Sequence, residues 1–237
     1  MGLRQDLWGA AQARHPCQRH HDQDAAATTR PRPGATTHRT ELGAVPGSAG
    51  RGIVDCDFFT VETIWLKTLY VLFFIQLSSS RVVVAGVTAI PDSAWVTQQA
   101  RNAAMDLDDQ QLPARFLLRD HDAKFTRSFD DVFQSAATEV IRTPIQAPKA
   151  NAYAERWVQT VRSKCLDWML VLGRRHLVRL LRVYARHYNQ QRPHRGLALS
   201  VPDAPEQDQD SMPVRPRDVR RRDVLGGLVH EYHTVAA

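Results

Sequence analysis

The fold is decided by the stretch Val54-Asp55-Cys56-Asp57-Phe58-Phe59-Thr60, which sets two carboxylates among β-branched and aromatic residues. Such a mixture is typical of a strand that enters a sheet. A second apolar run, Phe116-Leu117-Leu118-Arg119, leads directly into Asp120. A helical stretch then begins at Ala154-Glu155-Arg156-Trp157-Val158. Two strands and a helix are therefore predicted to bring three carboxylates together, those of Asp57, Asp120 and Glu155.

Three carboxylates suit the chemistry of phosphodiesters. Two hard divalent cations about 3.5–4 Å apart need both shared and separate oxygen ligands to hold a phosphodiester. One cation activates the attacking oxygen, and the other stabilises the leaving oxygen. Each acid taken alone is equally well explained as a solvated charge or a helix cap. The set of three, rather than any one of them, predicts a two-metal site for Mg²⁺ or Mn²⁺.

Two further aspartates compete for the same roles. Asp55 shares its strand face with Asp57, because side chains alternate along a strand with a period of two. Asp122 lies two residues after Asp120. We favour Asp120 over Asp122 because Asp120 directly ends the apolar run.

Four segments of the chain resemble a known family. They are Asp57-Phe58-Phe59-Thr60-Val61-Glu62-Thr63, Arg119-Asp120-His121-Asp122-Ala123-Lys124-Phe125, Ala150-Asn151-Ala152-Tyr153-Ala154-Glu155-Arg156 and Tyr188-Asn189-Gln190-Gln191-Arg192-Pro193-His194-Arg195-Gly196-Leu197. Together they resemble the integrase-core catalytic domain of bacterial insertion-sequence transposases, which are relatives of retroviral integrases. The resemblance covers roughly residues 51–200. The family places about 35 residues between its second Asp and its Glu, and here 34 residues separate Asp120 from Glu155.

The resemblance implies that Asp57, Asp120 and Glu155 are the catalytic residues and the metal ligands. Phe58-Phe59-Thr60 matches the family better when Asp57 rather than Asp55 is the ligand, while Asp122 stands where the family usually has a small residue. The implied reaction is attack by water at the end of a DNA element, followed by attack of the freed 3′-hydroxyl on target DNA. The implied assembly is a homo-oligomer that holds two DNA ends. No Ser or Tyr has a convincing neighbouring base, so a covalent protein intermediate is not expected.

Candidate DNA contacts surround the third acid. The spacing predicts a helix over 151–169 with Glu155, Gln159 and Arg162 on one face, and with Trp157, Val161, Cys165 and Trp168 on another. Asn151 suits the N-cap of this helix, and Lys149 lies in the proline-containing segment 144–150 just before it. The remaining candidates, from the two most specific segments, are Arg156, Arg192, His194 and Arg195. A basic helix carries Arg174, Arg175, His176, Arg179, Arg182 and Arg186, for which a solvated face and phosphate contact both remain open.

The order of elements predicts a ribonuclease H-like α/β fold, with a five-stranded mixed sheet flanked by helices. Strands are expected at 53–60, 69–77, 81–88, at the run ending in Asp120, and at 139–143. A helix over about 93–107 has Val96, Ala100, Ala103, Ala104 and Leu107 at helical spacing. A short helix places Phe125, Phe129, Val132 and Phe133 inward.

Three regions differ in composition. Residues 1–50 contain nine Ala but no Ile, Phe, Tyr or Lys, and such a segment is predicted to be disordered. One hypothesis is that it is translated out of frame, because Arg outnumbers Lys 27 to 4, as in a GC-rich gene. Residues 51–200 form the catalytic core, and 201–237 form a basic C-terminal tail whose role is open.

The net charge of +6 and the pI near 9.6 favour a polyanionic partner such as DNA. Cys17, Cys56 and Cys165 have no metal-ligand spacing and indicate a reducing compartment. No apolar run reaches the roughly 20 residues of a membrane span. The sequence therefore predicts a cytoplasmic DNA transposase or integrase, with a non-catalytic DNA-binding remnant and a nuclease that only hydrolyses as alternatives.

Overall fold

The computed structural model describes residues 52–109, 114–143, 152–204 and 218–234. The predictions made for residues 1–50, for Lys149 and for Asn151 lie outside the described residues. All of the described residues belong to the unit Glu41–Ala237.

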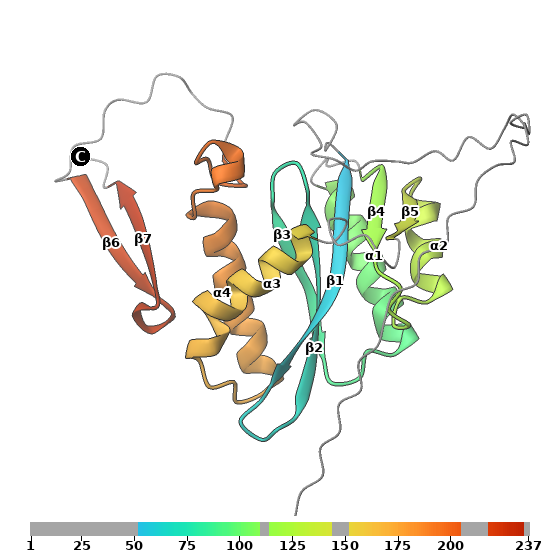
Figure 1. Cartoon of the computed structure of the whole chain (residues 1–237), viewed down its shortest axis with the longest axis horizontal. Helices are drawn as coiled ribbons and strands as arrows, with labels where there is room; N and C mark the ends of the chain where they lie inside the picture. Colours follow the sequence, from blue (N-terminus) through green and yellow to red (C-terminus); the bar gives the residue numbers. More distant parts are fainter. Residues whose placement is uncertain (1–51, 110–113, 144–151, 205–217, 235–237) are drawn as a thin grey trace, which may run out of the picture. The chain divides into compact units, whose positions relative to one another are not determined.

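A five-stranded sheet lies at the centre of this unit, in the order β3-β2-β1-β4-β5 (Figure 1). Its strands are β1 (Ile53–Glu62), β2 (Thr68–Gln76), β3 (Val82–Thr88), β4 (Phe116–Arg119) and β5 (Glu139–Arg142). β1, β2 and β3 form an antiparallel meander, whereas β4 runs parallel to both β1 and β5. The predicted ribonuclease H-like fold with a mixed sheet is confirmed.

Helices cover both faces of the sheet (Figure 1). On one face, α1 (Ser93–Asp109) and α2 (Arg127–Ser135) enclose a core with Val54 and Cys56 of β1. On the other, α3 (Ala152–Lys164) and α4 (Arg174–Gln190) pack over Phe59 and Val61. Because side chains alternate along a strand, Asp55 and Asp57 point to the same face as Phe59, the one covered by α3 and α4.

Trp157 of α3 is the centre of the second core. It is 1% exposed, and its ring lies 6.3 Å from that of Phe73, 5.8 Å from Tyr184 and 4.7 Å from Tyr188. These neighbours come from β2 and from α4. The Trp157 indole therefore packs α3 against both α4 and the sheet. This packing fixes the position of α3 over the sheet.

α3 is shorter than predicted. It ends at Lys164 and is followed by the 3₁₀ turn η1 (Leu166–Trp168). The tighter turn changes the direction of the side chains, so Trp168 is 70% exposed and does not share the buried face of Trp157 and Val161, contrary to the expectation from spacing. The Trp168 indole N–H instead donates to the Ser163 carbonyl at 2.9 Å.

α4 is fixed to the edge of the sheet by an amide side chain. Asn189 accepts a hydrogen bond from the Val82 N–H at 3.0 Å and donates one to the Val82 carbonyl at 2.8 Å. This pair of bonds occupies the backbone groups of β3 at Val82, which begins the edge strand. Just after α4 comes the short 3₁₀ turn η2 (Arg195–Leu197).

Part of the predicted basic tail is folded. β6 (Val219–Val224) and β7 (Val229–Thr234) form an antiparallel hairpin through the turn η4 (Leu225–Gly227), where Gly226 and Gly227 have φ of 68° and 91°. Val229 joins the core beneath α3 and α4, and buried Glu231 lies 3.6 Å from Nδ1 of His187. Burial lowers the pKa of His187, while Glu231 acts in the opposite direction. These strands were not expected from the sequence, because charged residues interrupt the apolar alternation.

Trp157 of α3 and Trp168 of η1 provide a test of stability. Trp157→Ala should lower the free energy of unfolding by about 3–5 kcal/mol, because it leaves a cavity between two helices and the sheet. Trp168→Ala should lower it by less than about 1 kcal/mol, since that ring is mostly in solvent. Urea unfolding of both variants measures the difference, and similar losses would contradict this description of the core.

Candidate active site

Parallel pairing of β1 with β4 brings the aspartates together. The register joins Asp55 to Leu118 and Cys56 to Arg119. Asp57 and Asp120 each follow the last residue that pairs β1 with β4, while Asp57 remains paired with Phe73 of β2. Asp55 interacts electrostatically with both of them. Three acidic side chains therefore lie on the α3 face of the sheet, at the point where β1 and β4 separate.

Asp55 is the most deeply buried of these acids. It is 1% exposed, and neither carboxylate oxygen makes a hydrogen bond with the described residues. Burial, reinforced first by Asp57 and more weakly by Asp120, raises its pKa to about 8, although the backbone amides of Ala154 and Cys56 act in the opposite direction. The influence of Ala154 places the first turn of α3, which contains Glu155, beside this carboxyl group.

The surroundings of Asp120 and Asp122 differ. Asp120 accepts a hydrogen bond from the Asp122 N–H at 3.0 Å. Asp122 accepts the Lys124 N–H at 2.9 Å and forms an ion pair with the Lys124 ammonium. Asp122 is therefore neutralised within its own turn, whereas Asp120 contributes to the field of the acidic cluster. This geometry favours Asp120 over Asp122 as a cation ligand.

The other two predicted metal ligands, Asp57 and Glu155, are more accessible to solvent than Asp55. Asp57 is half-buried and accepts the Phe58 N–H at 2.6 Å, and Glu155 is exposed in the first turn of α3. Within the described residues, no three Asp, Glu, His or Cys side chains converge closely enough to hold a metal ion. The donor set nonetheless fits a hard divalent cation, because carboxylate oxygens are its preferred ligands and Asp55 has two buried oxygens without partners.

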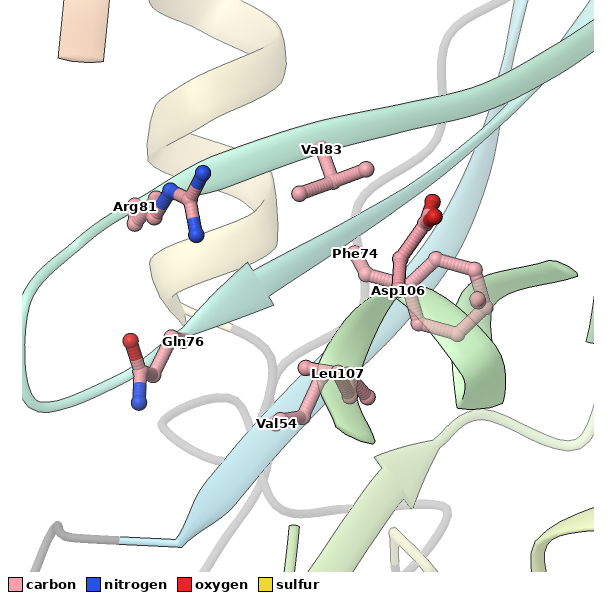
Figure 2. Close-up of a pocket in the computed structure, with 8 residues that line it drawn as sticks. Val54, Phe74, Gln76, Arg81, Val83, Asp106 and Leu107 are labelled. Atoms are coloured by element: carbon pink, nitrogen blue, oxygen red, sulfur yellow. The ribbon is translucent and has the colours of Figure 1, made fainter. Parts of the chain in front are cut away.

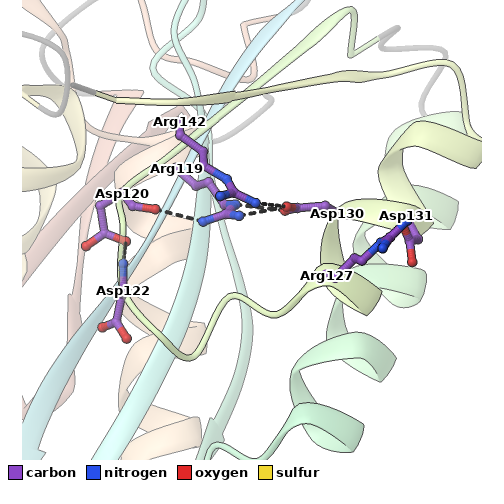
Figure 3. A network of polar contacts seen from close by, with 7 residues as sticks. All are labelled: Arg119, Asp120, Asp122, Arg127, Asp130, Asp131 and Arg142. Atoms are coloured by element: carbon purple, nitrogen blue, oxygen red, sulfur yellow. Dashed lines mark hydrogen bonds and ion pairs between the residues drawn. The ribbon is translucent and has the colours of Figure 1, made fainter. Parts of the chain in front are cut away.

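A buried ion pair on the other side of the sheet holds the end of β4 (Figure 3). Arg119 donates to both carboxylate oxygens of Asp130 in α2, at 2.8 and 2.7 Å, and Arg142 adds a third bond to Asp130 at 3.1 Å. The remaining Arg119 nitrogen donates to the backbone carbonyl of Asp120 at 2.9 Å. Arg119 is thus a positioning residue for Asp120, a role that its sequence context did not reveal.

Among the predicted DNA contacts, the structure brings three together around Tyr188. The Arg192 guanidinium lies 5.3 Å from the Tyr188 ring, and the His194 ring meets it edge-on at 4.5 Å. Burial raises the pKa of Tyr188, and the positive charges of Arg192 and Arg156 oppose that rise. Arg156 of α3 therefore shares this surface with the residues that follow α4.

The other predicted contacts lie elsewhere. Arg162 donates to the Thr60 carbonyl at 2.6 Å and lies 5.8 Å from the Phe59 ring, so its local role is to tie α3 to β1. Gln159, one turn earlier, and Arg195 in η2 are both exposed.

A small depression lies away from Asp55, Asp57 and Asp120 (Figure 2). Its lining includes Val54 and Phe74 from the core beneath α1, together with Asp106 and Leu107 of that helix. Its volume of about 20 Å³ is close to the space of a single water molecule. It therefore suits no organic ligand, and it belongs to the sheet face opposite the aspartates.

Loss of the Arg119 side chain should be costly. Arg119→Met should lower the free energy of unfolding by about 3–5 kcal/mol, because Asp130 would keep a buried charge without its main partner. The exposed pair of Arg127 and Asp131, with atoms 3.9 Å apart, provides the control, and Arg127→Met should change stability by less than about 0.5 kcal/mol. Urea unfolding compares them, and an equally small effect of both substitutions would contradict the positioning role.

Asp55 should make stability depend on pH in a metal-free buffer containing EDTA. Its pKa is raised from 3.8 to about 8, so the unfolded carboxyl group loses its proton first, and stability falls as pH rises from about 4 to about 8. Asp55→Asn removes this dependence and should gain roughly 3–5 kcal/mol over the wild type near pH 8. Thermal unfolding across this range measures the effect. Asp122→Asn is the control, and parallel pH curves for Asp55→Asn and the wild type would contradict the assignment.

Comparisons with known proteins identify a family for one segment and a fold for the chain. Residues 137–202 match the family model of the integrase core domain, a segment that contains Glu155 and extends through η2. No curated protein sequence matches the chain. No helix among the described residues has the length and apolar character needed to cross a membrane.

Solved structures of viral integrases are similar in fold. A chain of the simian T-cell lymphotropic virus intasome in complex with PP2A regulatory subunit B56 gamma aligns with a TM-score of 0.52 and 12% identity, over 77% of this chain and 66% of that one. The HTLV-2 integrase catalytic core domain in complex with magnesium, in its trimeric form, gives a TM-score of 0.49 and 12% identity, over 63% and 93%. The catalytic core domain of BIV integrase gives 0.45 and 12%, over 64% and 91%. The order of the sheet and the similarity to the chain of the simian virus intasome show an integrase-core, ribonuclease H-like fold, and residues 137–202 match the integrase core domain family.

Proposed function

We propose that this chain is a DNA transposase or integrase of a bacterial insertion sequence, and that it cuts and joins DNA strands in the cytoplasm as a homo-oligomer. The proposal is supported by Asp57 and Asp120 on the sheet face that α3 covers, by Glu155 in the first turn of that helix, and by the match of residues 137–202 to the integrase core domain. Among the described residues Glu155 is exposed, and an exposed carboxylate is accessible to a large substrate such as duplex DNA. The excess of basic residues agrees with that partner.

Asp57 and Asp120 would hold Mg²⁺ or Mn²⁺, and Glu155 would complete the ligand set from the first turn of α3. When bound, two such cations activate the attacking oxygen and stabilise the leaving oxygen of a phosphodiester. Arg119 keeps Asp120 in place through its backbone carbonyl. Asp55, buried beside Asp57, is the alternative ligand on β1.

The surface around Tyr188 would hold the DNA backbone next to the acids. Arg156, Arg192 and His194 gather there, and arginine binds phosphate oxygens with two parallel hydrogen bonds. Gln159, Arg195, Lys149 and Asn151 are further candidate contacts.

A non-catalytic DNA-binding remnant is the second candidate. It is favoured by one observation, that no three potential ligands converge on a common point within the described residues. Such a protein would retain the fold and the basic surfaces without turnover.

The deciding experiment is Mn²⁺-dependent joining of a labelled DNA end to plasmid. We expect a joined product from the wild type and a loss of roughly 100-fold or more in Glu155→Gln and Asp120→Asn, because each substitution removes a cation ligand. Asp122→Asn is the matched control and should retain activity within a few-fold.

Other outcomes separate the alternatives. Cleavage without joining would identify a nuclease that only hydrolyses. DNA binding with neither cleavage nor joining would identify a remnant. Full activity of Glu155→Gln would remove Glu155 from the site.

A further inference from the structure

The outer face of α4 is a row of arginines. Arg175, Arg179, Arg182 and Arg186 follow one another at i, i+4, i+7 and i+11, and all four are exposed. The opposite face of the helix is the buried stripe formed by Leu177, Leu180, Leu181, Tyr184 and Tyr188. At about 1.5 Å of rise per residue, the row is about 16 Å long. We call these four residues the arginine row.

Nothing in the described structure neutralises this row. α4 contains no Asp or Glu, and no ion pair between the described residues involves any of the four guanidinium groups. Like charges three or four residues apart destabilise a helix. Arg174 and Arg175 also lie in its first turn, where the helix dipole disfavours cations. A surface that serves only solubility ordinarily mixes both signs of charge.

The arginine row is separate from the acidic cluster. α4 packs against β3 at one edge of the sheet and is fixed there by Asn189. The aspartates lie on β1 and at the end of β4, and β2 intervenes between β1 and β3. Since the row faces away from the sheet, it does not form part of the surface that holds Asp57 and Asp120.

We propose that the arginine row is a second DNA-binding surface that contacts the phosphate backbone of duplex DNA outside the catalytic site. The proposal rests on the proposed function only in taking DNA as the partner. Successive arginines are about 4.5–6 Å apart along the helix axis, and a duplex presents a phosphate every 3.4 Å along each strand. A second copy of the chain is a poor occupant, because a two-fold contact across the row would oppose like charges. Binding through phosphates alone is independent of base sequence.

The test compares two variants of the full chain with equal loss of charge. Arg175→Gln/Arg179→Gln/Arg182→Gln removes three members of the row, and Gln keeps the helix because it is a good helix former. Arg101→Gln/Arg115→Gln/Arg127→Gln removes three exposed arginines from the opposite side of the sheet and from its connections. Circular dichroism checks that both variants fold. Fluorescence anisotropy of a labelled random-sequence duplex, in EDTA, gives the affinity as a function of salt concentration.

We expect the slope of log affinity against log salt to become shallower by about 0.9 for each phosphate that the protein no longer neutralises, hence by roughly 2–3 in the first variant. The control variant should keep a slope within about 1 of the wild type. Equal slopes for the two variants, an unchanged slope in the first, or no binding of duplex by the wild type would each overturn the proposal. An acidic protein segment as the true occupant would produce the unchanged slope.

The joining assay distinguishes failure of this inference from failure of the proposed function. A wild type that binds DNA through the row but joins no strands would overturn the proposed function and leave the second surface intact. If the wild type joins strands and the first variant keeps the salt slope of the wild type, the proposed function would stand and the second surface would be overturned.

Discussion

The parallel pairing of β1 with β4 is the constraint on which the rest of the structure depends. Because side chains alternate, this one register places Asp55, Asp57 and Asp120 on the same face of the sheet and Arg119 on the other. A slip of one residue in either strand would turn its acids into the core beneath α1 and α2. The acidic cluster is therefore a consequence of how two strands, more than fifty residues apart in the chain, align.

Buried charged groups of the sheet strands are paired on one face of the sheet and not on the other, within the described residues. On the α2 side, Arg119 and Asp130 satisfy one another with two hydrogen bonds, and Arg142 adds a third. On the α3 side, the Asp55 carboxyl group makes no hydrogen bond with the described residues and lies in the field of two other acids. A paired buried charge is tolerated, whereas an unpaired one disfavours folding unless it takes up a proton or binds a cation. The sheet thus has a network of paired charges behind Asp120 and, on its other face, an acidic cluster in which Asp55 makes no hydrogen bond with the described residues.

Aromatic packing connects this acidic surface to the basic ones. Trp157 holds α3 against β2 and α4. The first turn of the same helix contains Glu155, and the charge of the next residue, Arg156, acts on Tyr188. The hairpin of β6 and β7 adds Val229 to this core and brings Glu231 to His187 of α4. Acidic and basic side chains are therefore carried by helices and strands that share one apolar core.

Local patterns in the sequence determined the elements. Residue patterns located the five strands to within about two residues and indicated each of the four main helices, because these periodicities follow from backbone geometry. The apolar run placed Asp120 directly after β4 for the same reason, whereas Asp57 lies in the middle of β1 and pairs with Phe73 of β2. The C-terminal end of α3 was placed five residues too late, at 169 instead of Lys164. Spacing failed where the backbone left its regular path: η1 turned Trp168 outward, and the charged strands of the C-terminal hairpin carried no alternation to detect.

Only the tertiary structure decided which acidic side chains are buried and which form ion pairs. Asp55 and Asp57 look alike in the sequence, yet Asp55 is buried and makes no hydrogen bond within the described part of the chain, whereas Asp57 is half-buried. Asp122 forms an ion pair with Lys124. Arg119 donates hydrogen bonds to Asp130 and to the Asp120 carbonyl. The physical reason is that burial and ion pairing depend on neighbours from other strands and helices. A single sequence sets which groups are present, whereas packing in space sets which of them lose their water and which gain a partner.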